Sequence, residues 1–310
     1  MKIIMYHYVR KNSSNLPYLK YLHIEDFKKQ LDYFEKKFGF VKKDEFLNTF
    51  KNGKIPNGVV LTFDDGLKDH YKYVLPELKK RGLWGIFYIN YNPSERNKLL
   101  GPHRIHMLLG KFGGKKIFTS LTKIVLKKMI VKEYQKKFET KTYKDFKDED
   151  SATETKRILN YYISEKYREG LVDKLMQKYY PNEKKLVKKY YLNSKEIKKM
   201  QFAGMIFGAH TVNHPVMSKL SEKAQEKEIY PCFKFLEDIL DNNIRTYCHP
   251  YGGSLSFNKT TLKILKKSGS LFSLDVKPRD VSKKDIKYNK HSLPRYDCNL
   301  FPFGQIRSLV

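Results

Sequence analysis

Short apolar segments that alternate with amphipathic helical segments constrain the fold of this chain more than any other feature. Residues 2–9, 58–66 and 84–90 (KIIMYHYV, GVVLTFDDG and WGIFYIN) are rich in β-branched and aromatic residues, as buried strands are. Five apolar residues at helical spacing separate the first two segments: Ile24, Phe27, Leu31, Phe34 and Phe38. Strands separated by helices form βαβ units, so the chain is predicted to build a mostly parallel sheet.

The alternation is interrupted once, by residues 99–192, which are rich in lysine, helical in period and almost without strand signals. Further apolar segments follow at 202–210, 245–253 and 270–276, with helical stretches at about 219–241 and 257–268. We therefore expect an α/β fold, a distorted (β/α) barrel of about seven strands formed by residues 1–98 and 193–310, with a large helical insertion at 99–192.

Charge narrows the range of partners. The 62 Lys and Arg residues outnumber the 33 Asp and Glu residues, which gives a formal net charge of +29 at pH 7. A field of that sign favours phosphate-bearing ligands or anionic lipid headgroups. Because the basic residues are spread along the chain rather than concentrated in a recognisable module, specific nucleic-acid binding is not expected.

Cysteine content and hydropathy bear on the compartment. Cys232, Cys248 and Cys298 form no CxxC pair, which indicates reduced thiols rather than disulfides or a thiolate metal site. The sequence shows neither a signal-peptide apolar region nor an apolar run of about 18 residues. These features predict a cytoplasmic protein, and peripheral contact with the inner membrane face remains open.

Two pairs of chemically active residues follow predicted strands. Asp64 and Asp65 end the second apolar segment, and adjacent carboxylates at a buried strand end require a cation or a proton. His210 and His214 stand four residues apart after another strand, so a helical turn would project both imidazoles from one face. Two histidines and one carboxylate commonly hold a hydrolytic divalent metal. The alternatives are a solvated DDG turn and two structural histidines.

Three motifs follow predicted strands in this order: TFDDG at 62–66, HTVNH at 210–214 and HPYGG at 249–253. They resemble the first three motifs of the polysaccharide deacetylase family (NodB homology, carbohydrate esterase family 4). The resemblance covers residues 1–92 and 193–303. It implies the distorted (β/α) barrel, one divalent metal, usually zinc, and hydrolysis of N-acetyl groups on amino sugars.

The same resemblance implies roles for individual residues. Asp65, His210 and His214 would hold the metal, and Asp64 would be the general base that takes a proton from water. The backbone N–H of Tyr251 would meet the oxyanion of the tetrahedral intermediate.

The third motif departs from the family pattern. Many relatives carry there an arginine that pairs with the catalytic aspartate, whereas Cys248 and His249 precede Pro250 in this chain. Arg295, in the stretch HSLPRYD, is our candidate for the missing charge, as a partner for the Asp64 carboxylate. The alternative is an exposed arginine.

The chain also departs from the family pattern at the histidine that protonates the leaving amine. Relatives usually offer a late Leu-x-His motif, but residues 292–310 contain no histidine. The segment IIMYHYV resembles the N-terminal MYHxV segment of the permuted poly-N-acetylglucosamine deacetylase branch, in which this histidine lines the active site. His7 is therefore our candidate for the acid that protonates the leaving amine, with His291 as the second candidate.

The insertion has no counterpart in the family pattern. His103 and His106 begin it and are expected to be packing residues, while the insertion covers the barrel mouth and shapes substrate selection. The predicted function is removal of an N-acetyl group from an amino sugar, on a nucleotide- or lipid-linked precursor in cytosolic glycan biosynthesis. A deformylase or another non-peptide C–N hydrolase acting on a sugar, and a catalytically weak sugar-binding or scaffolding protein, are the alternatives.

Overall fold

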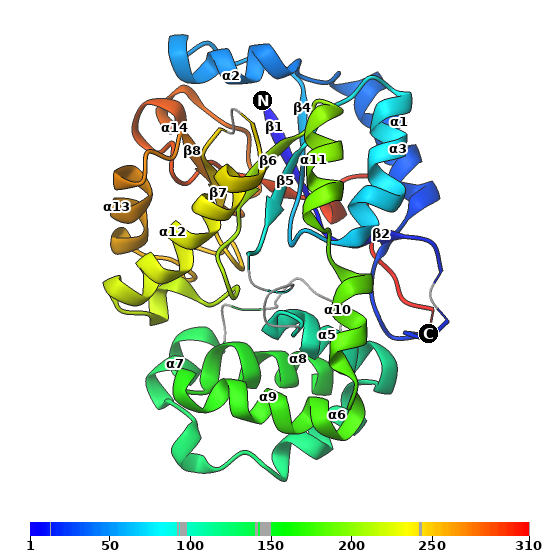
Figure 1. Ribbon diagram of the computed structural model, residues 1–310, viewed down its shortest axis with the longest axis vertical. Coiled ribbons are helices and arrows are strands. Elements are labelled where there is room, and N and C mark those ends of the chain that lie inside the picture. Colours follow the sequence, from blue (N-terminus) through cyan, green and yellow to red (C-terminus); the bar gives the residue numbers. More distant parts are fainter. Residues whose placement is uncertain are drawn as a thin grey trace. The chain divides into compact units, whose positions relative to one another are not determined.

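The chain divides into two compact units, drawn in Figure 1. The computed structural model describes residues 1–12, 14–91, 93, 98–139, 142, 150–241 and 244–309. Unit 1 comprises Met1–Lys11, Tyr21–Arg96 and Lys188–Ile306, and unit 2 comprises Asn12–Lys20, Asn97–Val187 and Arg307–Val310. The sequence had not assigned residues 12–20 to the helical segment.

Unit 1 is built on a seven-stranded parallel sheet with the order β8-β7-β6-β5-β4-β1-β9. The strands are β1 (Lys2–Tyr6), β4 (Val59–Phe63), β5 (Ile86–Ile89), β6 (Ile206–Ala209), β7 (Thr246–Cys248), β8 (Phe272–Leu274) and β9 (Tyr296–Asp297), and a separate pair joins β2 (Val9–Arg10) to β3 (Leu22–His23). The predicted α/β fold of about seven strands is confirmed.

Residues 293–297 connect the two edges of this sheet. Leu293 forms a parallel bridge to Leu274 of β8, and three residues later in this segment Tyr296 of β9 pairs with Ile4 of β1. The sheet therefore curls into a distorted barrel rather than ending in two free edges. Arg295 lies in the middle of this joining segment, between the two pairings.

Helices accompany the strands of unit 1, as the sequence predicted. They are α1 (Ile24–Lys37), α2 (Lys43–Asn52), α3 (Leu75–Lys80), α11 (Ser194–Phe202), α12 (Glu222–Ile239), α13 (Lys259–Lys267) and α14 (Lys283–Tyr288), with a π-helical turn at His70–Val74 and 3₁₀ turns at Met217–Lys219 and Cys298–Leu300. Helix α1 buries four of the five apolar residues that predicted it, and the fifth, Phe38, is its C-cap. The apolar residues at helical spacing thus form the buried face of α1, as predicted.

Alternation along β4 decides which side chains enter the barrel. Val59, Leu61 and Phe63 belong to the larger hydrophobic cluster, which also contains the buried apolar residues of α1, whereas Val60 belongs to a second cluster on the other face. Thr62 shares the face of Val60 because side chains alternate along a strand. The next residue on that face is Asp64, so the pleat itself directs one carboxylate into the barrel interior.

Unit 2 is helical and contains a buried arginine, Arg104. Its helices are α5 (Gly101–Phe112), α6 (Gly114–Thr122), α7 (Lys132–Phe138), α8 (Asp150–Arg157) and α9 (Glu165–Tyr179); α10 (Glu183–Tyr190) follows, with a 3₁₀ turn at Lys127–Met129 and a π-helical turn at Ile158–Tyr162. Arg104 of α5 is only 2% exposed and pairs with three carboxylates of this unit: Glu169, Asp173 and Glu183. His103 and His106 lie on the same helix with their ring centroids 6.0 Å apart.

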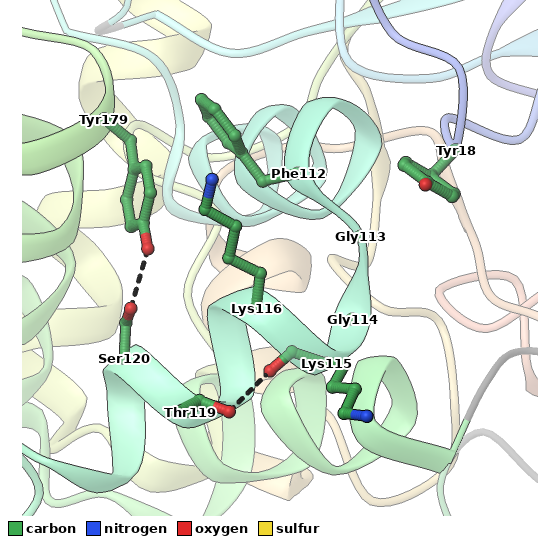
Figure 2. Close-up of a pocket in the computed structure, with 9 residues that line it drawn as sticks. All are labelled: Tyr18, Phe112, Gly113, Gly114, Lys115, Lys116, Thr119, Ser120 and Tyr179. Atoms are coloured by element: carbon green, nitrogen blue, oxygen red, sulfur yellow. Dashed lines mark hydrogen bonds between the residues drawn. The ribbon is translucent and has the colours of Figure 1, made fainter.

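An open cavity of about 570 Å³ lies in unit 2 at the junction of α5 and α6. Figure 2 shows the ammonium of Lys116 directed between two aromatic rings, with its Nζ 5.2 Å from the centroid of Phe112 and 5.9 Å from that of Tyr179. The hydroxyls of Ser120 and Tyr179 are hydrogen-bonded at 2.7 Å. None of the candidate site residues is among those that line this cavity. Among the helices described, none has both the length and the apolar character needed to cross a bilayer.

Candidate metal centre and active site

The two adjacent aspartates occupy different positions because the chain turns sharply between them. Asp64 continues the β4 direction, and its N–H donates to the carbonyl of Tyr6, whereas Asp65 adopts a φ of 74° and Gly66 a φ of 59°. A Cβ at Gly66 would lie 3.0 Å from Cδ1 of Ile89, so both the backbone and the space favour glycine there. The left-handed turn directs Asp65 away from the barrel interior that Asp64 faces.

Asp65, His210 and His214 converge at the carboxyl end of the sheet. The Oδ1 atom of Asp65 lies 3.4 Å from Nε2 of His210 and 3.5 Å from Nε2 of His214. One donor atom from each residue lies within 4.8 Å of the other two, and all three residues are buried. A carboxylate and two imidazoles at this spacing form a donor set suited to a divalent cation.

The orientation of His210 fits a metal ligand. Its Nδ1 donates to the carbonyl of Cys248 at 2.8 Å, which fixes the tautomer with Nε2 unprotonated in the neutral ring. That buried Nε2 has no hydrogen-bond partner among the residues described and is directed at Asp65. Burial lowers the pKa of His210, but Cys248, Asp65 and Asp64 together raise it well above its usual value. The surroundings thus favour positive charge, as a cation site requires.

Asp64 is held by a buried bidentate ion pair with Arg295. The arginine Nη1 donates to Oδ1 at 2.9 Å and Nη2 donates to Oδ2 at 2.8 Å, and the two side chains are 2% and 1% exposed. Burial raises the pKa of Asp64, but the charge and hydrogen bonds of Arg295 outweigh it and lower the pKa to about 2. Asp64 is therefore an ionised carboxylate that makes no ion pair with either ligand histidine among the described contacts.

Three further contacts fix the Arg295 guanidinium. Its Nη1 donates to Thr62 Oγ1 at 3.0 Å, its Nε donates to the carbonyl of Asp275 at 3.2 Å, and its Nη2 lies 2.8 Å from Cys248 Sγ. Thr62 is in reach because it shares the inner face of β4 with Asp64. The segment that joins the sheet edges therefore delivers a positive charge that the third sequence motif lacks.

His7 follows β1 and lies beside both aspartates. Its Nε2 is 4.0 Å from Oδ2 of Asp64 and 3.9 Å from Oδ2 of Asp65, and its side chain is 40% exposed. The carbonyl of His7 is 2.9 Å from Nε2 of the buried His70, which anchors the backbone at this point. His7 thus combines contact with the acidic pair and access to solvent.

His291, the second candidate for the acid, occupies a different setting. Its carbonyl lies 2.9 Å from Nε2 of His249, and burial together with Lys290 and Lys266 lowers its pKa to about 4. No ion pair between His291 and either aspartate is present among the described residues. The geometry brings His7 to the acidic pair and not His291.

Tyr251 lies in the loop after β7 and packs its ring against His214, with centroids 4.8 Å apart at 70°. Its φ is 62°, which a residue with a Cβ adopts only where its surroundings impose it. Asp65, Thr211 and His214 share this property, and only one other non-glycine residue among those described, Phe303, has a positive φ. Backbone strain in the described chain is thus concentrated at the three sequence motifs.

Several residues around the site were not foreseen from the sequence. Asn90, at the end of β5, donates its Nδ2 to the carbonyls of His210 and Thr211, and its position at a strand end was a usable signal. No role in the site was assigned to Cys248 from the sequence, yet its Sγ lies 3.4 Å from Oδ2 of Asp64. Glu228, buried on α12, binds the loop between the two histidines and had no sequence signal.

The chain resembles known proteins in a sequence profile and in its fold. The sequence profile of the family described as polysaccharide deacetylase matches residues 172–272, a stretch that contains the second and third motifs but not TFDDG. No significant match was found among curated protein sequences.

Solved structures resemble the chain over nearly its whole length. The deacetylase PplD of Streptococcus pyogenes, in complex with acetate, has 18% identity and a TM-score of 0.58 over 96% of this chain and 91% of that chain. IcaB from Ammonifex degensii has 18% identity and a TM-score of 0.51, covering 88% and 82%. The deacetylase domain of BpsB from Bordetella bronchiseptica has 11% identity and a TM-score of 0.51, covering 96% and 94%.

At these identities the structural likeness establishes the fold, and the profile match adds two of the three motifs. The remaining motif, TFDDG, lies at the end of β4, which adjoins β5 in the same sheet. Its aspartates lie beside the two histidines. Residues 172–272 thus match the polysaccharide deacetylase profile, and the whole chain shares the fold of solved deacetylases.

Proposed function

We propose that this protein is a metal-dependent hydrolase that removes the N-acetyl group from an amino sugar. The observation that carries the proposal is the unequal treatment of two neighbouring aspartates. Asp65 lies within 3.5 Å of both histidine Nε2 atoms, while Asp64 is paired with Arg295. A hydrolase of this kind needs one carboxylate as a ligand and a second that is free to take a proton.

Asp65, His210 and His214 would hold the metal, which we propose to be zinc because two imidazoles and a carboxylate with open positions suit it. The bound ion supplies a Lewis acid for the acyl carbonyl and a water of lowered pKa. The hydrogen bond from His210 to the Cys248 carbonyl keeps the ligand nitrogen oriented towards this position.

Asp64 would act as the general base. Arg295 holds the pKa of Asp64 at about 2, so the carboxylate is ionised at neutral pH, as a base must be before it takes a proton. The bidentate contact also fixes its orientation, which supports proton transfer along one direction. As Asp64 takes the proton of water, the new O–C bond forms at the acyl carbon.

His7 would complete the reaction as the general acid. Its Nε2 lies within 4.0 Å of both aspartates, and the ring is partly open to solvent, so a proton can be delivered to the amide nitrogen as the C–N bond breaks. The products are acetate and the free amine of the sugar. The backbone N–H of Tyr251, beside His214, would donate to the oxyanion in between.

We further propose that the substrate sugar carries phosphate, as a nucleotide- or lipid-linked precursor does. The support is electrostatic, because a net charge of +29 creates a field that concentrates anionic substrates. An uncharged polymer would gain nothing from such a field.

The proposal is tested by acetate release from acetylated sugars with zinc-loaded protein. Asp64→Asn should abolish release while zinc still binds, whereas Asp65→Asn should lower zinc content as well, and Asp44→Asn, on the exposed side of α2, is the matched control. Full acetate release by Asp64→Asn would exclude Asp64 as the base.

The substrate part of the proposal has its own test. N-acetylated nucleotide sugars and neutral chitooligosaccharides are compared at low and high ionic strength, since screening weakens the attraction of an anionic substrate. We expect turnover of the nucleotide sugar to fall as the ionic strength rises. Acetate release from the neutral oligosaccharides alone would exclude a phosphate-bearing substrate.

A further inference from the structure

The loop that joins the two histidine ligands is held in a conformation that it would not adopt unaided. Thr211 has a φ of 66° and His214 a φ of 57°, and the left-handed conformation is unfavourable for each of these residues because it brings Cβ close to the following carbonyl oxygen. Contacts outside the loop must therefore hold it, because a relaxed loop would move one imidazole away from the other.

The ends of the loop have evident contacts. The Oγ1 of Thr211 accepts from the N–H of His214 at 3.0 Å, and the side chain of Asn90 donates to the carbonyls of His210 and Thr211. These bonds reach the backbone of both ligand residues and Thr211. They leave the middle of the loop, Val212 and Asn213, to be fixed from elsewhere.

Glu228 binds the middle of the loop from helix α12. Its Oε2 accepts from the N–H of Val212 at 3.0 Å and from the N–H of Asn213 at 2.8 Å, and its Oε1 accepts from the Asn213 side chain at 2.6 Å. The carbonyl of the same glutamate also accepts from the N–H of Val212, at 3.1 Å. Glu228 is only 9% exposed, so these are buried, charge-assisted hydrogen bonds.

We propose that Glu228 is a positioning residue of the metal centre, which sets metal affinity by fixing the loop between His210 and His214. It contacts Val212 and Asn213, two of the three residues between the ligands, rather than the ion, so its effect passes through the geometry of the imidazoles. This inference rests on the proposed ligand set. Outer residues that orient metal ligands typically contribute roughly 10–100-fold to metal affinity.

A hydrogen-bonding role predicts a difference between two substitutions. Glu228→Leu removes every side-chain acceptor and should weaken zinc binding by roughly 10–100-fold. Glu228→Gln keeps an oxygen for the two backbone N–H groups, and the Asn213 amide can turn to pair with the new amide. Its zinc affinity should stay within about threefold of the wild type, because amide orientations adapt to their partners.

The experiment measures zinc affinity of the full chain, freed of metal by chelation, through competition with a chromogenic chelator. Glu222→Leu, an exposed position on the same helix whose side chain pairs with Lys263 at 3.5 Å, is the control and should leave affinity unchanged. Asn213→Ala removes one of the three side-chain acceptor contacts of Glu228 and is a milder perturbation should Glu228→Leu fail to fold. Its affinity should fall by about threefold, a fraction of the roughly 10–100-fold effect of losing all the contacts.

Each outcome bears on a different statement. Unchanged zinc affinity in Glu228→Leu, or in Asn213→Ala where the leucine variant does not fold, overturns the inference. Equal losses in Glu228→Leu and Glu228→Gln also overturn it, because the charge rather than the hydrogen bonds would then act. Absence of zinc binding by the wild type would instead refute the ligand set of the proposed function.

Discussion

Removing the positive partner of Asp64 should destabilise unit 1 strongly. In Arg295→Met the Asp64 carboxylate stays buried, but it loses two charge-assisted hydrogen bonds of 2.8 and 2.9 Å. Methionine is long and flexible enough to fill much of the space, so the loss of charge dominates the effect of the cavity. The substitution therefore isolates what the ion pair contributes.

The structure gives the magnitude from two directions. The pKa of Asp64 is lowered from 3.8 to about 2, which corresponds to roughly 2–3 kcal/mol of stability at neutral pH. Leaving one partner of a buried pair uncompensated typically costs about 3–5 kcal/mol. The second figure is larger because burial then raises the pKa of a carboxylate that has lost its partner. For a unit of this size the fall in Tm is on the order of 10 °C.

Urea unfolding of the metal-free protein measures this effect. The single tryptophan, Trp84, lies in unit 1, where its Nε1 donates to the carbonyl of Val41 at 2.8 Å. Its fluorescence therefore reports on unit 1 alone. The variants are Arg295→Met, Asp64→Asn and the double variant, which form a double-mutant cycle.

The double variant should be less destabilised than the two single variants added together, by at least about 2 kcal/mol, since it leaves no buried charge unpaired. Additivity to within about 0.5 kcal/mol would refute the reasoning, because it would mean that the two groups do not stabilise each other.

Three further predictions concern single side chains. His7→Gln should lower turnover by roughly 10²–10⁴-fold with zinc affinity unchanged, and undiminished acetate release would remove His7 from the mechanism. Cys248→Ala removes the Sγ contacts with Arg295 and Asp64 but keeps the carbonyl that orients His210, so kcat should fall while zinc still binds; loss of zinc would contradict this separation. Burial lowers the pKa of His249 from 6.5 to about 3, so the unfolded chain binds the extra proton between these values and stability should fall as the pH drops from 6.5 towards 3. His249→Gln should make the urea midpoint depend less on pH in that range, and an unchanged pH dependence would show that His249 does not contribute.

Local patterns carried much of the fold. Asn193 and Glu196 have the three-residue spacing of a capping box in the sequence, and they form that reciprocal box at the beginning of α11. The short apolar runs at TFDDG, HTVNH and HPYGG became the parallel strands β4, β6 and β7 of one sheet, because hydrophobic period and length separate strands from helices. What these patterns do not encode is long-range pairing, which is why residues 12–20 were not placed in unit 2.

The site was predictable only as far as motifs and strand ends reach. Asp64, Asp65, His210 and His214 follow strands of one parallel sheet, so their meeting at its carboxyl edge follows from topology. Glu228 could not be found, because it is one of several glutamates on an amphipathic helix and only the packing of α12 selects it. A buried Arg295 could not be distinguished from an exposed one by sequence pattern, because its burial depends on how residues 293–297 close the sheet.

The joining segment at 293–297 also has a consequence for folding kinetics. Ile4 pairs with Tyr296, so the two strands meet only after nearly the whole chain has been brought into a closed loop, and such non-local pairing slows folding. Until it forms, β1 and β8 present unpaired backbone edges of the kind that promote aggregation. Because Arg295 arrives with the same segment, the step that removes these edges also neutralises the buried Asp64 carboxylate. Assembly of the barrel and maturation of the base are therefore expected to be a single, late event.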